Sequence, residues 1–196
     1  MTRPIPPDLG KIAGLAIASG VALMAFSGDF AMETVVVEAG ELRGGVRFFS
    51  RPPQLVDSIT TFNAVSIPAA KYYFTIALPE QAGEPLDRVV FQQQPNPDPI
   101  NFYPEQTFAF FGDRHNRGQE IALESVNWDK TAGKITVTFA QAIAPGTIIT
   151  IGLKPWKNPD VPGVYQFRVF ALPPGTNSQA MDLGVARFQF YRGGTW

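Results

Sequence analysis

The chain has 196 residues, of which 45% are hydrophobic and 17% are charged, and its formal net charge is −1. This length suits one domain with a buried core, and a near-neutral chain without a basic run excludes a nucleic-acid partner held by phosphate neutralisation. The chain contains no cysteine, so disulfides, zinc–thiolate sites, iron–sulfur clusters and a cysteine nucleophile are excluded too.

The first recognisable pattern is the apolar run from Ile12 to Phe26. Two basic residues precede it, and Ala25-Phe26-Ser27 ends it with small residues at the positions that a signal peptidase reads. The run is shorter than the roughly 20 residues that span a bilayer. We therefore predict a cleaved signal peptide over residues 1–27 and a single β-sandwich domain over residues 28–196 that does not span a membrane. An uncleaved N-terminal anchor is the alternative.

The next part of the chain contains strand-like runs of unequal regularity. Thr34 to Glu38 is rich in β-branched residues and predicts a first strand or an extended arm, and Val46 to Ser50 predicts a second strand. Gln54 to Asn63 alternates in mixed phase, which indicates an irregular or edge-like segment. Lys71 to Leu78 predicts the most regular strand of the chain, with Tyr72, Phe74, Ile76 and Leu78 on one face.

The middle of the chain alternates between strands and loops. Asp87 to Gln94 predicts a strand, and the alternating prolines of Pro95 to Pro99 favour an extended loop after it. Thr107 to Phe111 is short and apolar, as expected of a strand buried in a sandwich, and the polar segment Gly112 to Gln119 predicts a loop. Leu123 to Trp128 predicts a further strand.

The last third contains four more predicted strands, and the segment Asn177 to Asp182 indicates a helical turn. These strands are Ile135 to Phe139, Thr147 to Leu153, Val164 to Leu172 and Leu183 to Tyr191. About eight to ten short strands at regular spacing, with no helical period after the apolar run, predict an all-β protein. We expect an antiparallel two-sheet β-sandwich of the immunoglobulin-like kind.

Five ordered blocks between Tyr72 and Tyr191 resemble a family of exported cyanobacterial proteins, the domain-of-unknown-function family DUF2808. The blocks read YYFTIALP with AGEPL, then FAFFGDRHNRG, then PGT through LKP, then NP through GVYQF, and finally LG with Arg187 and FY. The resemblance implies a β-rich protein that is secreted, periplasmic or thylakoid-lumenal. It brings no assigned activity with it.

The loop that contains Asp113, Arg114, His115 and Arg117 is a candidate recognition loop. His115 is the only histidine in the chain and would act as a metal ligand or a general base beside Asp113, or would be a solvated loop residue. The two arginines would present guanidinium groups to an anionic group. The structural alternative is that Asp113 accepts backbone N–H bonds in a turn while the arginines bridge strand ends.

Trp156 is the second candidate recognition residue. It lies in the segment Lys154 to Pro159, between two lysines and two prolines. An exposed tryptophan there indicates a role in binding, since such residues often anchor interfaces. A tryptophan that closes one end of the sandwich is the alternative.

The sequence predicts no catalytic residue, no cofactor and no transition-metal site, because a single histidine without cysteine is a poor ligand set. Calcium is the one metal left open, since it needs only oxygen ligands. The loop residues that offer such oxygens are equally good turn formers: Asp98, Asn101, Asp113, Asp129 and Asp160.

These observations favour an exported, non-enzymatic protein that binds a protein or another partner of the envelope, the thylakoid lumen or the cell wall. The expected location is the periplasm, the thylakoid lumen or the exterior. A module that binds a glycan or calcium is the alternative. A hydrolase built around His115 and Asp113 is a third hypothesis, although no Gly-x-Ser-x-Gly motif is present.

Overall fold

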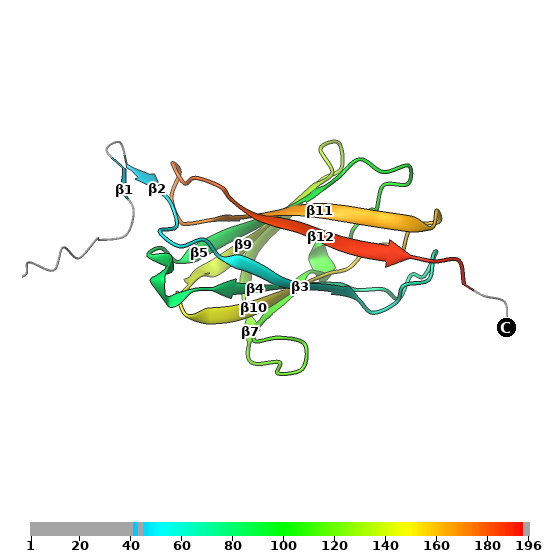
Figure 1. The fold of residues 1–196 in the computed structure, drawn as a ribbon, viewed down its shortest axis with the longest axis horizontal. Coiled ribbons are helices and arrows are strands. Elements are labelled where there is room, and N and C mark those ends of the chain that lie inside the picture. The colour runs from blue at the N-terminus through cyan, green and yellow to red at the C-terminus, as the bar shows by residue number, and fades with distance from the viewer. Residues whose placement is uncertain (1–40, 43–44, 194–196) are drawn as a thin grey trace, which may run out of the picture. The chain divides into compact units, whose positions relative to one another are not determined.

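The computed structural model describes residues 41–42 and 45–193, shown in colour in Figure 1. The predicted signal peptide and the predicted strand from Thr34 to Glu38 lie outside these residues. Within the described residues, no helix is long and apolar enough to cross a membrane. A short antiparallel hairpin of β1 (Glu41–Leu42) and β2 (Val46–Arg47) begins the described part.

Ten further strands of the described chain form two five-stranded sheets, and neighbouring strands in both sheets are antiparallel. The first sheet has the order β3 (Gln54–Thr60), β4 (Tyr72–Leu78), β10 (Thr147–Leu153), β6 (Phe108–Phe111) and β7 (Glu120–Ile121). The second has the order β12 (Met181–Phe190), β11 (Gly163–Leu172), β5 (Leu86–Gln93), β9 (Lys134–Ile143) and β8 (Leu123–Asp129). Two 3-10 turns are η1 (Glu80–Ala82) and η2 (Pro104–Gln106).

An aromatic core lies between the two sheets. Side chains of a strand alternate between its faces, so every second residue of β4, and every second residue of β11 from Tyr165 to Ala171, points inward and is buried. The ring centroids of Tyr72 and Phe188 are 4.8 Å apart, and those of Phe74 and Phe91 are 4.4 Å apart. Burying each such ring contributes about 1.5–3 kcal/mol. The architecture confirms the predicted all-β, immunoglobulin-like antiparallel sandwich.

Three local predictions differ from the structure. The helical turn expected over Asn177 to Asp182 is wrong, because Met181 and Asp182 pair with Ala171 and Phe170 and begin β12. The strand expected from Val46 to Ser50 ends at Arg47. β7 was not expected at all, since two residues are too few to show an alternation.

The two loops that contain the predicted site residues lie at opposite ends of β10. The loop from Gly112 to Gly118 leaves the sheet beside the start of β10, where the Gly112 N–H donates to the carbonyl of Ile148. Figure 1 shows this loop beside the β7 label, whereas β12 ends on the right. The loop after β10 lies at the other end, where the Trp156 N–H donates to the carbonyl of Asn101.

Candidate recognition site at one end of the sandwich

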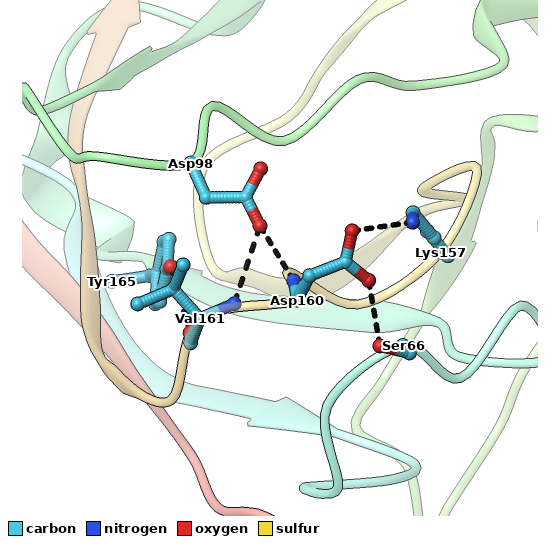
Figure 2. Close-up of polar contacts among 6 residues, drawn as sticks. All are labelled: Ser66, Asp98, Lys157, Asp160, Val161 and Tyr165. Atoms are coloured by element: carbon cyan, nitrogen blue, oxygen red, sulfur yellow. Dashed lines mark hydrogen bonds and ion pairs between the residues drawn. The ribbon is translucent and has the colours of Figure 1, made fainter.

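The loop between β10 and β11 is fixed by two carboxylates, as Figure 2 shows. The carboxylate of Asp98 accepts the N–H groups of Asp160 at 2.5 Å and of Val161 at 3.4 Å. The carboxylate of Asp160 accepts hydrogen bonds from Lys157 Nζ and from Ser66 Oγ, both at 2.6 Å. These two bonds, the one from Lys157 first, hold the pKa of Asp160 below its ordinary value. Both aspartates therefore shape the loop.

Beneath this loop, Asn158 is fully buried and its side chain has hydrogen bonds on both polar atoms. Its Oδ1 accepts the hydroxyl of Tyr72 at 2.9 Å. Its Nδ2 donates to the carbonyls of Phe62 at 2.9 Å and Ala64 at 2.7 Å. A buried amide that satisfies three groups ties the loop to β4 and to the segment before it.

Trp156 lies on this scaffold and is 43% exposed. Its indole Nε1 donates to the carbonyl of Phe102 at 3.0 Å, which fixes the orientation of the ring. The ring centroid of Tyr103, itself 37% exposed, lies 5.8 Å from that of Trp156. Lys130 Nζ lies 4.7 Å from the Trp156 centroid, a cation–π distance. We call Trp156 and Tyr103 the aromatic rim.

A cavity of about 460 Å³ lies beside this rim, between the end of β5, the turn that joins β8 to β9, and the proline-spaced loop after β5. We call it the amide cavity, because five amide side chains line it together with Trp128 and Lys130: Gln92, Gln93, Gln94, Asn96 and Asn101. A neighbouring cavity of about 320 Å³ shares Pro99 and Asn101 with it and is lined by Trp156.

Within residues 45–193, two buried side-chain polar atoms have no hydrogen-bond partner, and both belong to residues that line the amide cavity. They are Gln93 Oε1, an acceptor, and Trp128 Nε1, a donor. Gln93 as a whole is only 8% exposed. Leaving a buried polar group unpaired costs about 1–3 kcal/mol, so two such atoms at one cavity distinguish it from ordinary core.

The loop that contains Asp113 has a different construction. The Asp113 carboxylate accepts the backbone N–H groups of His115 at 2.7 Å and Asn116 at 2.8 Å. These bonds, the one from Asn116 first, hold the pKa of the Asp113 carboxyl below its ordinary value. Gly112, with φ of 89°, makes the turn possible, since a side chain there would collide with the Asn116 carbonyl.

The two arginines of this loop lie over aromatic rings on the outer face of the first sheet. The Arg114 guanidinium lies 5.2 Å from the Tyr73 centroid. Arg117 lies 4.7 Å from the centroid of Phe110 and 5.5 Å from that of Phe108. These contacts place the loop across the sheet and cover rings that would otherwise face water.

The structure thus brings four of the predicted site residues together and separates the fifth from them. Asp113, Arg114, His115 and Arg117 share one exposed loop, while Trp156 lies at the opposite end of β10. The recognition role of each group stays a prediction.

The carboxylates considered for calcium have hydrogen-bond roles instead. Asp98 and Asp160 hold the loop after β10, Asp113 forms its own turn, and Asp129 accepts the N–H of Ala132 at 3.0 Å. In the described part of the chain, no three His, Cys, Asp or Glu residues come together in a way that would hold a metal ion. The four aspartates therefore act as hydrogen-bond acceptors that shape turns and loops.

Sequence reasoning missed most of the amide cavity. One signal was present, because the alternation that buries Val89 and Phe91 also places Gln93 on the inner face of β5. A polar residue in an inner position marks either a hydrogen-bonded core group or a binding site. No sequence pattern near Lys130 or Trp156 indicates that the two side chains are in contact.

These features define an immunoglobulin-like β-sandwich with an amide-lined cavity and an aromatic rim at one end. The sequence matches the family described as Protein of unknown function (DUF2808) over residues 46–190, and the chain belongs to that family. This match confirms the resemblance seen in the sequence. A comparison with curated proteins gave no match.

Several solved structures of bacterial proteins resemble the chain in fold at very low identity. The C-terminal domain of the Streptococcus pyogenes antigen I/II-family protein AspA is 10% identical, with a TM-score of 0.41 over 65% of this chain and 41% of that one. The group B streptococcus pilus 2b backbone protein is 10% identical, with a TM-score of 0.41 over 65% and 55%. The collagen-binding domain of a Staphylococcus aureus adhesin is 9% identical, with a TM-score of 0.35 over 63% and 87%. The chain thus spans about half the length of the first two.

Proposed function

We propose that the chain is an exported, non-catalytic binding protein that holds a partner of the cell envelope, the thylakoid lumen or the cell wall. It does so through the aromatic rim and the amide cavity. The observation that carries this proposal is an exposed tryptophan fixed beside a cavity whose buried polar atoms lack partners. Exposed aromatic rings next to unpaired hydrogen-bonding groups are typical of binding sites.

The rigidity of this end supports binding. The loop that presents Trp156 is held through Asp98, Asp160 and the buried amide of Asn158, so little conformational entropy is lost when a partner docks. The indole N–H bond to Phe102 keeps one ring orientation. A site fixed before binding needs fewer contacts to reach a given affinity.

The geometry of His115 and Asp113 supports a non-catalytic role. A general base of the His–Asp kind needs the carboxylate to orient the imidazole. Here both backbone bonds of the Asp113 carboxylate come from the loop itself, and His115 is exposed. Asp113 therefore stabilises the turn that contains His115.

Export rests on the apolar run from Ile12 to Phe26 with its small-residue ending. A protein without cysteine needs no oxidising compartment to fold, so its stability there depends on the aromatic core. We propose the periplasm, the thylakoid lumen or the exterior as its location.

Photo-crosslinking in living cells tests the binding surface. A benzophenone amino acid replaces Trp156 in the full chain. In a matched control it replaces Ile148, which is 47% exposed and lies in β10 at the end of the strand opposite to Trp156. Benzophenone inserts into nearby C–H bonds of proteins and glycans alike. We expect an adduct from position 156 and none from position 148. Equal adducts from both positions, or none from either, would contradict the proposal.

A further inference from the structure

We propose that the amide cavity binds a neutral saccharide, with the aromatic rim beside it available to a further sugar unit. This inference rests on the proposed function, because it names the ligand chemistry of the same site. Three features of the cavity favour a saccharide: the hydrogen-bonding state of its amides, its two unpaired atoms and the charge of its lining.

The amide side chains of the cavity offer acceptors. Gln92 Nε2 donates to the carbonyl of Ala132 at 2.5 Å, and Asn96 Nδ2 donates to the carbonyl of Gln94 at 3.0 Å. Gln94 Nε2 in turn lies 3.4 Å from the carbonyl of Gln92. Since a carbonyl can only accept, the nitrogen of each amide must face it. The amide oxygens are left for a ligand that donates hydrogen bonds.

The two unpaired atoms call for a group that both donates and accepts. Gln93 Oε1 needs a donor and Trp128 Nε1 needs an acceptor. A hydroxyl supplies both capacities. Both atoms are buried in residues that line the cavity, so a ligand hydroxyl reaches them only when these side chains reorient toward it.

The lining selects against ions. Lys130 is the one charged residue among those that line the cavity, and its ammonium lies over the Trp156 ring. The lining contains no carboxylate to attract a cation, and one lysine is too little to hold a polyanion. Neutral amides beside aromatic rings suit a ligand with many hydroxyls and a C–H face, which is the chemistry of a sugar.

The test is a calorimetric titration of the full chain with three neutral hexasaccharides: cellohexaose, maltohexaose and chitohexaose. A blocked Gly–Ser hexapeptide serves as the peptide probe. We expect at least one hexasaccharide to bind and the peptide not to bind. Binding of the peptide alone, or of no probe, would overturn the proposal.

Two variants locate the binding. Gln93→Leu removes the unpaired acceptor, so we expect it to weaken saccharide binding at least tenfold. The melting temperature should rise by about 2–4 °C, because the free protein no longer buries an unsatisfied polar group. Trp128→Phe should weaken binding likewise. Gln141→Leu, an exposed glutamine on β9, should leave the affinity unchanged. A structural role for Gln93 would lower the melting temperature instead.

The outcomes separate this inference from the proposed function. Unchanged affinity in both Gln93→Leu and Trp128→Phe overturns the saccharide site. Loss of affinity in both, with near-ultraviolet circular dichroism retained, supports it. A crosslinked adduct at position 156 without any saccharide binding overturns the saccharide alone, whereas the absence of both removes the proposed function as well.

Discussion

Three surface carboxylates accept hydrogen bonds that favour their charged form. Asp113 bonds to backbone N–H groups, Asp160 to Lys157 and Ser66, and Asp182 to Arg168 and the Gly184 N–H, the Arg168 Nε bond being 2.8 Å. In each case these bonds hold the pKa of the aspartate below its ordinary value of 3.8. A pKa that is lower in the folded state links stability to pH.

We therefore expect these carboxylates to make the fold lose stability only in strong acid, below about pH 4. The stabilisation from these carboxylates is present above about pH 4, the unfolded value, and is lost as the pH falls through their lower folded pKa values. Urea midpoints measured between about pH 6 and pH 2 should show this decline. A variant with Asn at positions 113, 160 and 182 should show a flatter profile. A steep loss near neutral pH would contradict this account.

Asn158 holds in place the loop that carries Trp156 of the aromatic rim. Asn158→Ala removes one acceptor and two donated bonds, leaving Tyr72 Oη and two loop carbonyls without their partner. We expect a loss of about 3 kcal/mol in the free energy of unfolding, measured by urea denaturation. The control Asn96→Ala removes a single bond at a half-buried site and should cost about 1 kcal/mol or less. An equal loss of unfolding free energy in both variants would show that Asn158 does not hold the loop to β4.

At the scale of the strand, β10 and β6 are fitted to each other at one glycine. Gly152 pairs with Phe108, whose ring lies where a Cβ of residue 152 would be. We expect Gly152→Ala to cost about 1–3 kcal/mol in unfolding free energy, because the ring must move from its place. The double variant with Phe108→Leu should recover part of this loss. A double-mutant cycle measures the coupling, and strict additivity would contradict the proposed contact.

The strands with clean alternation, such as β4 and β11, were predictable because the inward-facing residues of each are buried. β3 was harder. Its register shifts between Leu55 and Asp57, and such a bulge changes which residues share a face. This bulge explains why the apolar residues of this segment alternate in mixed phase in the sequence. β7 and the false helical turn before β12 depend on pairing partners far away in the chain.

The candidate site was only partly predictable for the same reason. Trp156 stands out in the sequence because of its flanking prolines and lysines. The cavity beside it combines the end of β5, the β8–β9 turn and the loop after β5. Lys130 and Trp156 meet only because β9 and β10 belong to facing sheets, and no local pattern encodes that approach.

At the scale of the whole molecule, the central pairings join distant parts of the chain. Thr75 of β4 and Thr150 of β10 are 75 positions apart and hydrogen-bond at 3.0 Å, and β5 pairs with β11 across a similar stretch. Loops of this length must close before the pairing stabilises them. We expect refolding in roughly milliseconds to seconds, measured by stopped-flow fluorescence. Refolding within microseconds would contradict this topology.

The central claim is that the amide cavity of this molecule binds a neutral saccharide. Heteronuclear NMR spectra of the full chain, recorded during titration with cellohexaose, maltohexaose and chitohexaose, test it most directly. We predict that the side-chain amide signal of Gln93 and the indole N–H signal of Trp128 shift in saturable fashion for at least one saccharide, while the backbone signals of residues 112–118 stay in place. Shifts confined to residues 112–118, or no shift with any of the three, would contradict the claim.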